Sequence, residues 1–204
     1  MLVFVMSSVA SAAIITNVDR WGGASGNRQP IGAYTGDTDP LPGDAGGLAD
    51  GSVIFSDRVY VYAFTPDPLK GAEYIRTFNN DKHNDNSVNY AVILSSACTY
   101  AIGIDDRFGG SSELQAMVDA IAPDFIPAGT FTDSGLDLTI HEQNAGEYRP
   151  ISVFTATLPA GSYTFTGRGF GGRRNFMVMA AIPEPATIAL LGVGGLALLR
   201  RKRS

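Results

Sequence analysis

The stretch ISVFTATLPAGSYTFT, residues 151–166, is the clearest strand signal in this chain of 204 residues. β-Branched and aromatic residues dominate both of its halves, and such residues favour a pleated, half-buried strand. Pro159, Ala160 and Gly161 lie between the halves, and a three-residue connection that contains glycine is typical of a β-hairpin. The sequence therefore predicts an antiparallel hairpin of strands 151–158 and 162–166.

Runs of the same character recur along the chain, bounded by Gly, Pro, Asn and Asp. They lie at residues 59–64, 74–78, 88–94, 98–104, 136–140 and 175–181. Eight short strands at such spacing indicate an all-β fold, a single β-sandwich of jelly-roll type. One short helix is expected at residues 111–122, because Ser111 or Ser112 can cap it, an apolar stripe follows, and Pro123 ends it.

The N-terminal segment has the character of a secretory signal peptide. Leu2 to Val9 is apolar, and Ala10-Ser11-Ala12 matches the A-x-A site of signal peptidase. Residues 1–12 are therefore expected to be removed, with the mature chain starting near Ala13. No Lys or Arg precedes the apolar run, so the true start could lie upstream. Alternatively, residues 1–15 form a buried first strand, since periodicity does not separate the two cases.

The other end combines an extended junction, an apolar run and a cationic end. Pro183-Glu184-Pro185 precedes the uncharged run 186–199, and the basic end follows it. That basic end is Arg200, Arg201, Lys202 and Arg203. Cations next to an apolar span stay on the cytoplasmic side of a membrane. Fourteen helical residues cover about 21 Å, against about 30 Å of hydrocarbon. The run is therefore expected to be a transient transmembrane helix, with a permanent membrane anchor as the alternative.

This tail closely resembles the PEP-CTERM sorting domain of surface proteins from Gram-negative bacteria that make extracellular polysaccharide. The resemblance implies recognition by an exosortase, a membrane-embedded protease or transpeptidase, with Pro183, Glu184 and Pro185 as recognition residues. It also implies passage through the secretion machinery and a transient stay in the inner membrane. The expected division is a signal peptide at 1–12, an extracellular domain at 13–181 and a sorting signal at 182–204.

Removal of both signals would leave an acidic domain. Acids fall from 20 to 19 and bases from 15 to 11, so the net charge is −8. This charge disfavours nucleic acid as a partner. Cys98 is the only cysteine, so no internal disulfide can form, and the thiol is expected to be a small buried hydrophobe.

Two groups of side chains are candidate ligand sites. Asp37, Asp39 and Asp44 lie in the glycine-rich stretch 22–51 and could bind calcium, although their spacing is not that of an EF-hand. The alternative is a solvated loop without a cofactor.

Arg168, Arg173 and Arg174 form a basic patch that could pair with carboxylates, including those of acidic sugars. The accompanying G-x-G-x-x-G at 167–172 lacks the following helix that a dinucleotide site needs. A glycine-rich hairpin is the simpler reading of that stretch.

No catalytic signature is found. His141-Glu142 begins like H-E-x-x-H, but residue 145 is Ala, and no G-x-S-x-G occurs. His83 and His141 are expected to be structural or solvated. Asp105 and Asp106 adjoin at a strand end, and because neighbours in a strand point to opposite faces, they make a poor glycosidase pair. One of them is expected to bond Arg107 or to cap the loop.

The sequence thus predicts a non-enzymatic, structural or adhesive surface protein that associates with extracellular polysaccharide. A secreted polysaccharide-degrading enzyme is the alternative, because a fold does not dictate a function. Convergent acids with one raised carboxyl pKa would favour the enzyme. An exposed face of Tyr or Trp would favour binding.

Overall fold

The computed structural model describes residues 13–22, 29–31, 47–55, 59–77, 88–142, 145–167 and 178–182. Several predicted features lie outside the described residues. They are the signal peptide with Ala10 and Ala12, the acids Asp37, Asp39 and Asp44, the turn residue His83, the basic patch Arg168, Arg173 and Arg174, the sorting residues Pro183, Glu184 and Pro185, and the basic end Arg200, Arg201, Lys202 and Arg203.

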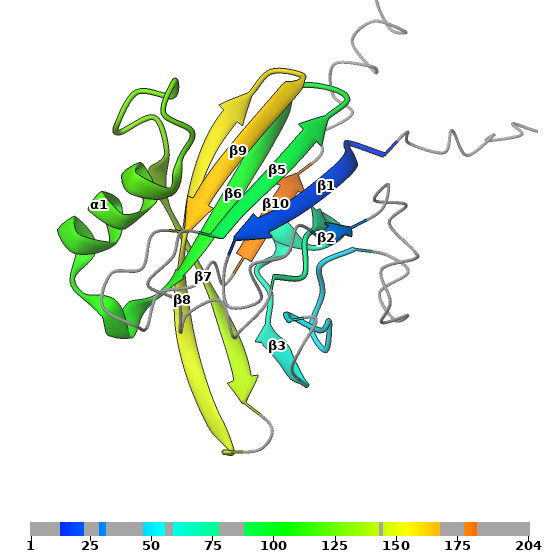
Figure 1. Ribbon diagram of the computed structural model, residues 1–204. Coiled ribbons are helices and arrows are strands. Elements are labelled where there is room, and N and C mark those ends of the chain that lie inside the picture. The colour runs from blue at the N-terminus through cyan, green and yellow to red at the C-terminus, as the bar shows by residue number, and fades with distance from the viewer. Residues whose placement is uncertain are drawn as a thin grey trace, which may run out of the picture.

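The described chain forms two antiparallel sheets that face each other (Figure 1). The smaller sheet has the order β2-β1-β5-β9, with bounds Gln29–Ile31, Ile15–Gly22, Val88–Leu94 and Gly161–Gly167. The larger sheet has the order β3-β7-β8-β6-β10-β4, with bounds Tyr60–Phe64, Thr132–Glu142, Glu147–Leu158, Cys98–Asp105, Val178–Ile182 and Glu73–Tyr74. The prediction of an all-β, two-sheet fold is confirmed.

The predicted hairpin at residues 151–166 is wrong. β8 and β9 belong to different sheets: β8 pairs with β6, where Leu158 lies opposite Cys98, and β9 pairs with β5, where Gly161 lies opposite Leu94. The connection therefore crosses from one layer to the other. Both strands carry apolar rows, and placing them in facing sheets buries each row against the other. The hydroxyl of Tyr163 donates to the carbonyl of Pro159 at 2.8 Å and holds the crossing in place.

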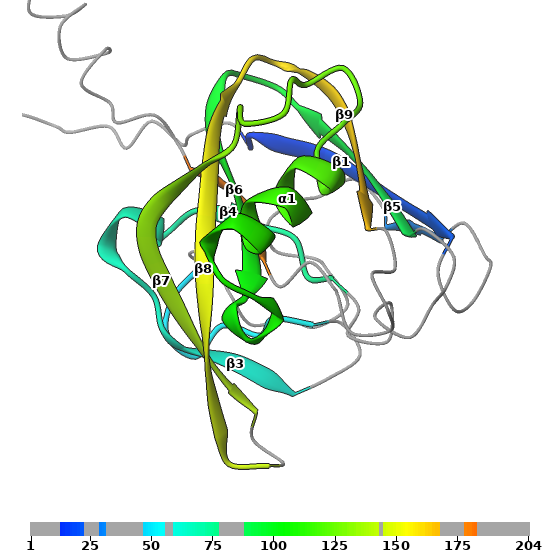
Figure 2. The same ribbon diagram turned by 90° about the vertical axis from the view of Figure 1, so that its left-hand side faces the viewer.

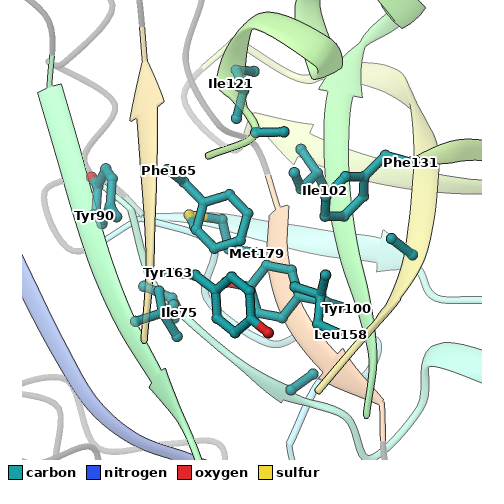
Figure 3. Packing of buried hydrophobic residues seen from close by; sticks show 14 of the residues in the cluster. Ile75, Tyr90, Tyr100, Ile102, Ile121, Phe131, Leu158, Tyr163, Phe165 and Met179 are labelled. Carbon is teal, nitrogen blue, oxygen red and sulfur yellow. The ribbon is translucent and has the colours of Figure 1, made fainter. Parts of the chain in front are cut away.

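The space between the sheets is filled by aromatic and aliphatic side chains (Figure 3). Phe165 of the smaller sheet stacks on Tyr100 of the larger one, with ring centroids 4.9 Å apart. Phe131 meets the edge of Phe165, with centroids 6.4 Å apart. Cys98 is fully buried in this core as a free thiol, which confirms its predicted role.

The predicted helix is confirmed as α1, Ser111–Ile121. Its stripe of Leu114, Met117, Val118 and Ile121 is buried. Figure 2 shows α1 at the side of the sandwich between the two sheets, and it contacts β9. The predicted serine cap is wrong, because Gly110 is the N-cap and no side chain caps the helix. Helix α1 thus covers the edge of the smaller sheet.

The larger sheet is buried on its second face as well, by a separate apolar cluster. Residues 51–55 run along the outer side of β3, where the amide of Ile54 donates to the carbonyl of Tyr60 at 3.0 Å. They also connect the two outer strands, since Val53 bridges to Val61 and Phe55 bridges to Thr77 beyond β4. A short 3-10 helix, η1 at Asp67–Leu69, adds Leu69 to the cluster. Burial on two faces explains why β6 is apolar along most of its length.

Some strand bounds differ from the prediction. β7 and β8 extend beyond the expected 136–140 and 151–158, while β4 has two residues instead of 74–78. β1 was not predicted, because the polar residues Thr16, Asn17, Asp19 and Arg20 interrupt the apolar pattern. The alternative of a first strand at 1–15 is testable only at its end, where Ile14 and Ile15 are buried.

Candidate functional site

The β7–β8 hairpin forms an extension at one end of the molecule (Figure 1). Residues 147–150 of β8 pair with β7, whereas the pairing of β8 with β6 ends at Ile151. β8 starts at the tip of the hairpin with Glu147 and ends at Leu158, eleven residues further on. At 3.3 Å per residue, the tip lies about 36 Å from that far end. This tip presents two different surfaces, because alternate side chains of a strand point to opposite faces.

An aromatic pair lies on one face of the hairpin. His141 and Tyr148 are directly opposite each other in the register, and their rings stack with centroids 4.5 Å apart and planes 7° apart. Tyr148 is 65% exposed, so its ring is available to a ligand. We call His141 and Tyr148 the tip pair. His141 is thus partly exposed and stacked on an aromatic partner, and it lies within β7, not after the strand as predicted.

An ionic network lies on the opposite face. Arg149 forms ion pairs with Glu142 and with Glu147, the latter at 2.9 Å, and Tyr60 donates its hydroxyl proton to Glu142. The side chains of Arg149 and Glu142 are only 16% and 15% exposed. This network joins β3, β7 and β8 at the same end of the hairpin that carries the tip pair.

Asp105 and Asp106 are both used in local structure. The carboxylate of Asp105 is buried and accepts from the backbone amide and from the guanidinium of Arg107, at 2.9 Å for the amide and 2.9 Å for Nε. The hydrogen bonds that the Arg107 guanidinium donates to Asp105 are the main reason that the pKa of Arg107 is raised. Asp106 accepts from the amide of Ser152 at 2.8 Å. The prediction that one of these acids bonds Arg107 or caps the loop is confirmed, because Asp105 bonds Arg107 and is also the N-cap of the 3-10 helix η3, Asp106–Phe108.

The pKa of the Asp137 carboxyl is raised. Burial is the largest cause, and the charges of Asp106 and Asp133 add to it. The side chain is nevertheless exposed. Among the residues that the structure describes, no three His, Cys, Asp or Glu side chains come together in a way that could hold a metal ion.

The ligand candidates from the sequence, the Asp37 group and the Arg168 group, lie outside the described ranges, so these predictions remain untested. The tip pair was missed by sequence reasoning, which ended the strand at residue 140. The glycine-containing segment Gln143-Asn144-Ala145-Gly146 between two polar strand ends was the available signal. Within the described part of the chain, no helix has both the length and the apolar character needed to cross a membrane.

Comparison with solved structures finds a likeness to a β-glucuronidase from glycoside hydrolase family 2. The TM-score is 0.47 and the identity 21%, over 74% of this chain. The chain spans 14% of the length of that enzyme. No curated protein matches the sequence. Residues 181–203 match the PEP-CTERM protein-sorting motif, and the resemblance predicted from the tail is thereby confirmed: this chain carries a PEP-CTERM sorting motif that begins in strand β10.

Proposed function

We propose that this protein is an extracellular matrix or cell-surface protein whose sandwich domain has an adhesive role and contacts extracellular polysaccharide. The sorting motif carries the first part of the proposal, because it indicates a secreted protein that is processed by an exosortase. In this proposal, residues 186–199 cross the inner membrane transiently, with the basic end in the cytoplasm. Signal peptidase removes residues 1–12, and exosortase then acts near Pro183 to Pro185.

Both processed ends leave the domain on the same side. Ile15 pairs with Leu94 and Ile182 pairs with Thr99, so β1 begins and β10 ends next to the connection 95–97. The β7–β8 tip lies at the other end of β8, about 36 Å away by strand rise. While the tail is held in the membrane, the tip pair therefore faces outward, which supports the tip as the contact surface.

The role of exosortase is tested by intact-mass measurement of the mature protein from a host with the enzyme and from one without it. We expect the tail to be lost near Pro183 to Pro185 only where the enzyme is present. Replacing Pro183, Glu184 and Pro185 together by alanine should abolish that loss. A mature protein that keeps Arg200 to Arg203 in both hosts would instead be permanently anchored in the membrane.

Ligand contact is tested by Tyr148→Ala in the folded domain. We expect this substitution to weaken binding to the host's purified extracellular polysaccharide about tenfold, because stacking of one aromatic ring contributes on the order of 1 kcal/mol. Phe64→Ala is the matched control, since Phe64 is 53% exposed on β3 and is not part of the tip. Equal binding by both variants would exclude the tip pair as the contact.

Incubation of the native protein with the same polysaccharide tests the alternative function, a polysaccharide-degrading enzyme. The observation in its favour is that burial and the charges of Asp106 and Asp133 raise the pKa of Asp137, which is the direction that a general acid in glycoside hydrolysis needs. Release of soluble saccharide fragments by the native protein, and its loss in Asp137→Asn, would support hydrolysis and would contradict a purely adhesive role.

A further inference from the structure

The first described residues of the chain are fastened by two side chains from distant parts of the sequence. The amide of Ile14 donates to both carboxylate oxygens of Glu73, at 2.9 Å each, and the amide of Ile15 donates to Oε2 at 2.8 Å. On the other side, Ser95 donates its hydroxyl to the carbonyl of Ala13 at 2.6 Å and its amide to the carbonyl of Ile14 at 2.8 Å. The start of β1 is thus held between β4 and the 95–97 connection.

Burial fixes this position. Ile14 and Ile15 are 4% and 0% exposed, and both belong to the core between the sheets. We therefore expect the carboxylate of Glu73 to lie next to the backbone of residue 14 both in the precursor and in the cleaved chain. Among the described residues, Glu73 forms no ion pair with a cationic side chain. Its carboxylate accepts hydrogen bonds there from the backbone amides of Ile14 and Ile15.

Cleavage by signal peptidase would change the charge at this point. Hydrolysis of the bond between Ala12 and Ala13 consumes one water and leaves a carboxylate on the leader and an α-amine on Ala13. One extended residue spans about 3.5 Å, so the nitrogen of Ala13 lies roughly 4–6 Å from the group that binds the amide of Ile14. An opposite charge within that range favours the charged form of a titratable group. The neutral amide of the precursor becomes an ammonium group beside a carboxylate.

We propose that Glu73 is the receptor for the mature N-terminus, and that removal of the signal peptide completes an ion pair between the α-ammonium group of Ala13 and the Glu73 carboxylate. This inference rests on the proposed export and cleavage after Ala12. Glu73 lies opposite Ala181 in the register of β4 and β10, and Ala181 is the first residue of the sorting motif. The ion pair therefore also stabilises the strand that leads into the exosortase signal.

Few other titratable groups face this site. β10 and residues 95–97 contain no titratable side chain. Cys98, which starts β6, is buried in the core, and Asp67 and Lys70 near β4 pair with each other at 2.8 Å. The N-terminal amine is therefore the group whose titration Glu73 is best placed to alter.

The test begins by reading the N-terminus of the secreted protein by mass spectrometry. The pKa of its α-amine is then measured from the pH dependence of labelling with an amine-reactive reagent. With a start at Ala13, we expect the pKa to lie about one unit above the ordinary 7.7–8.0 and to return to that range in Glu73→Gln. Glu113→Gln, on the exposed face of α1, is the control and should leave the raised pKa unchanged.

The sign of the effect on stability follows from the raised pKa. Near neutral pH, where both groups of the pair are charged, the ion pair contributes fully to stability, and this contribution is lost as pH rises from about 7.7, the value of the unfolded chain, through the folded pKa of the amine. Native protein should therefore lose thermal stability between about pH 8 and 10, more than Glu73→Gln does. An ordinary amine pKa in the native protein starting at Ala13 would refute the receptor role, even if the variant does not fold. A start at another residue would refute the cleavage site and with it the ion pair, whereas loss of the tail tests exosortase separately.

Discussion

Phe165→Ala is expected to lower the free energy of unfolding by about 3–5 kcal/mol. Phe165 is fully buried, stacks on Tyr100 and meets the edge of Phe131. It extends from the smaller sheet into the core that the larger sheet and α1 share (Figure 3). Its removal leaves a cavity between the smaller sheet, the larger sheet and α1. The surrounding structure relaxes only partly into such a cavity, so most of the cost remains.

Urea denaturation of the folded domain measures this loss. Phe125→Ala is the matched control, because the same atoms are removed from a ring that is 68% exposed. Phe125 contacts Tyr163 with ring centroids 5.8 Å apart, so its loss should cost less than about 1 kcal/mol. Similar losses in the two variants would mean that Phe165 does not join the layers as described.

Arg149→Met is expected to lower the free energy of unfolding by about 3 kcal/mol. The substitution keeps an apolar stem of similar length but removes the cation beside Glu142, which is 15% exposed. A carboxylate held away from water without its partner is costly, and Tyr60 supplies one hydrogen bond to it but no charge.

Two further variants locate that effect. In Arg149→Met combined with Glu142→Gln, part of the stability should return, because no buried charge is left unpaired. Glu147→Gln should cost less than about 1 kcal/mol, since Glu147 is 59% exposed and its pair with Arg149 is a surface one. An additive double variant would show that Arg149 acts through packing of its stem and not through the charge of Glu142.

Local patterns were enough for several elements. Residues 88–94 alternate between buried and partly exposed or exposed side chains, and the predicted strand there is confirmed to the residue. The stripe at Leu114, Met117, Val118 and Ile121 gave α1 to within one residue. β1 was missed because Thr16, Asn17, Asp19 and Arg20 interrupt its apolar pattern, and Arg20, two positions from Val18, is itself buried.

The candidate site was less predictable. His141 and Tyr148 are seven positions apart, and only the register of β7 with β8 brings their rings together. Glu73 and Ile14 are 59 positions apart, so no spacing rule connects them. Contacts of this kind depend on which strands pair, and strand pairing is a property of the whole sheet.

The sequence by itself determined most of the strands, the helix and the sorting motif, because each depends on a local property: side-chain shape, periodicity, or an apolar run next to cations. The tertiary structure alone decided that β8 and β9 lie in different sheets. Residues 151–166 satisfy a hairpin and a crossing equally well in local terms. The crossing prevails because it places Phe154 and Phe165 in facing sheets that enclose one core, and the burial of that core depends on residues from both sheets that no local stretch contains.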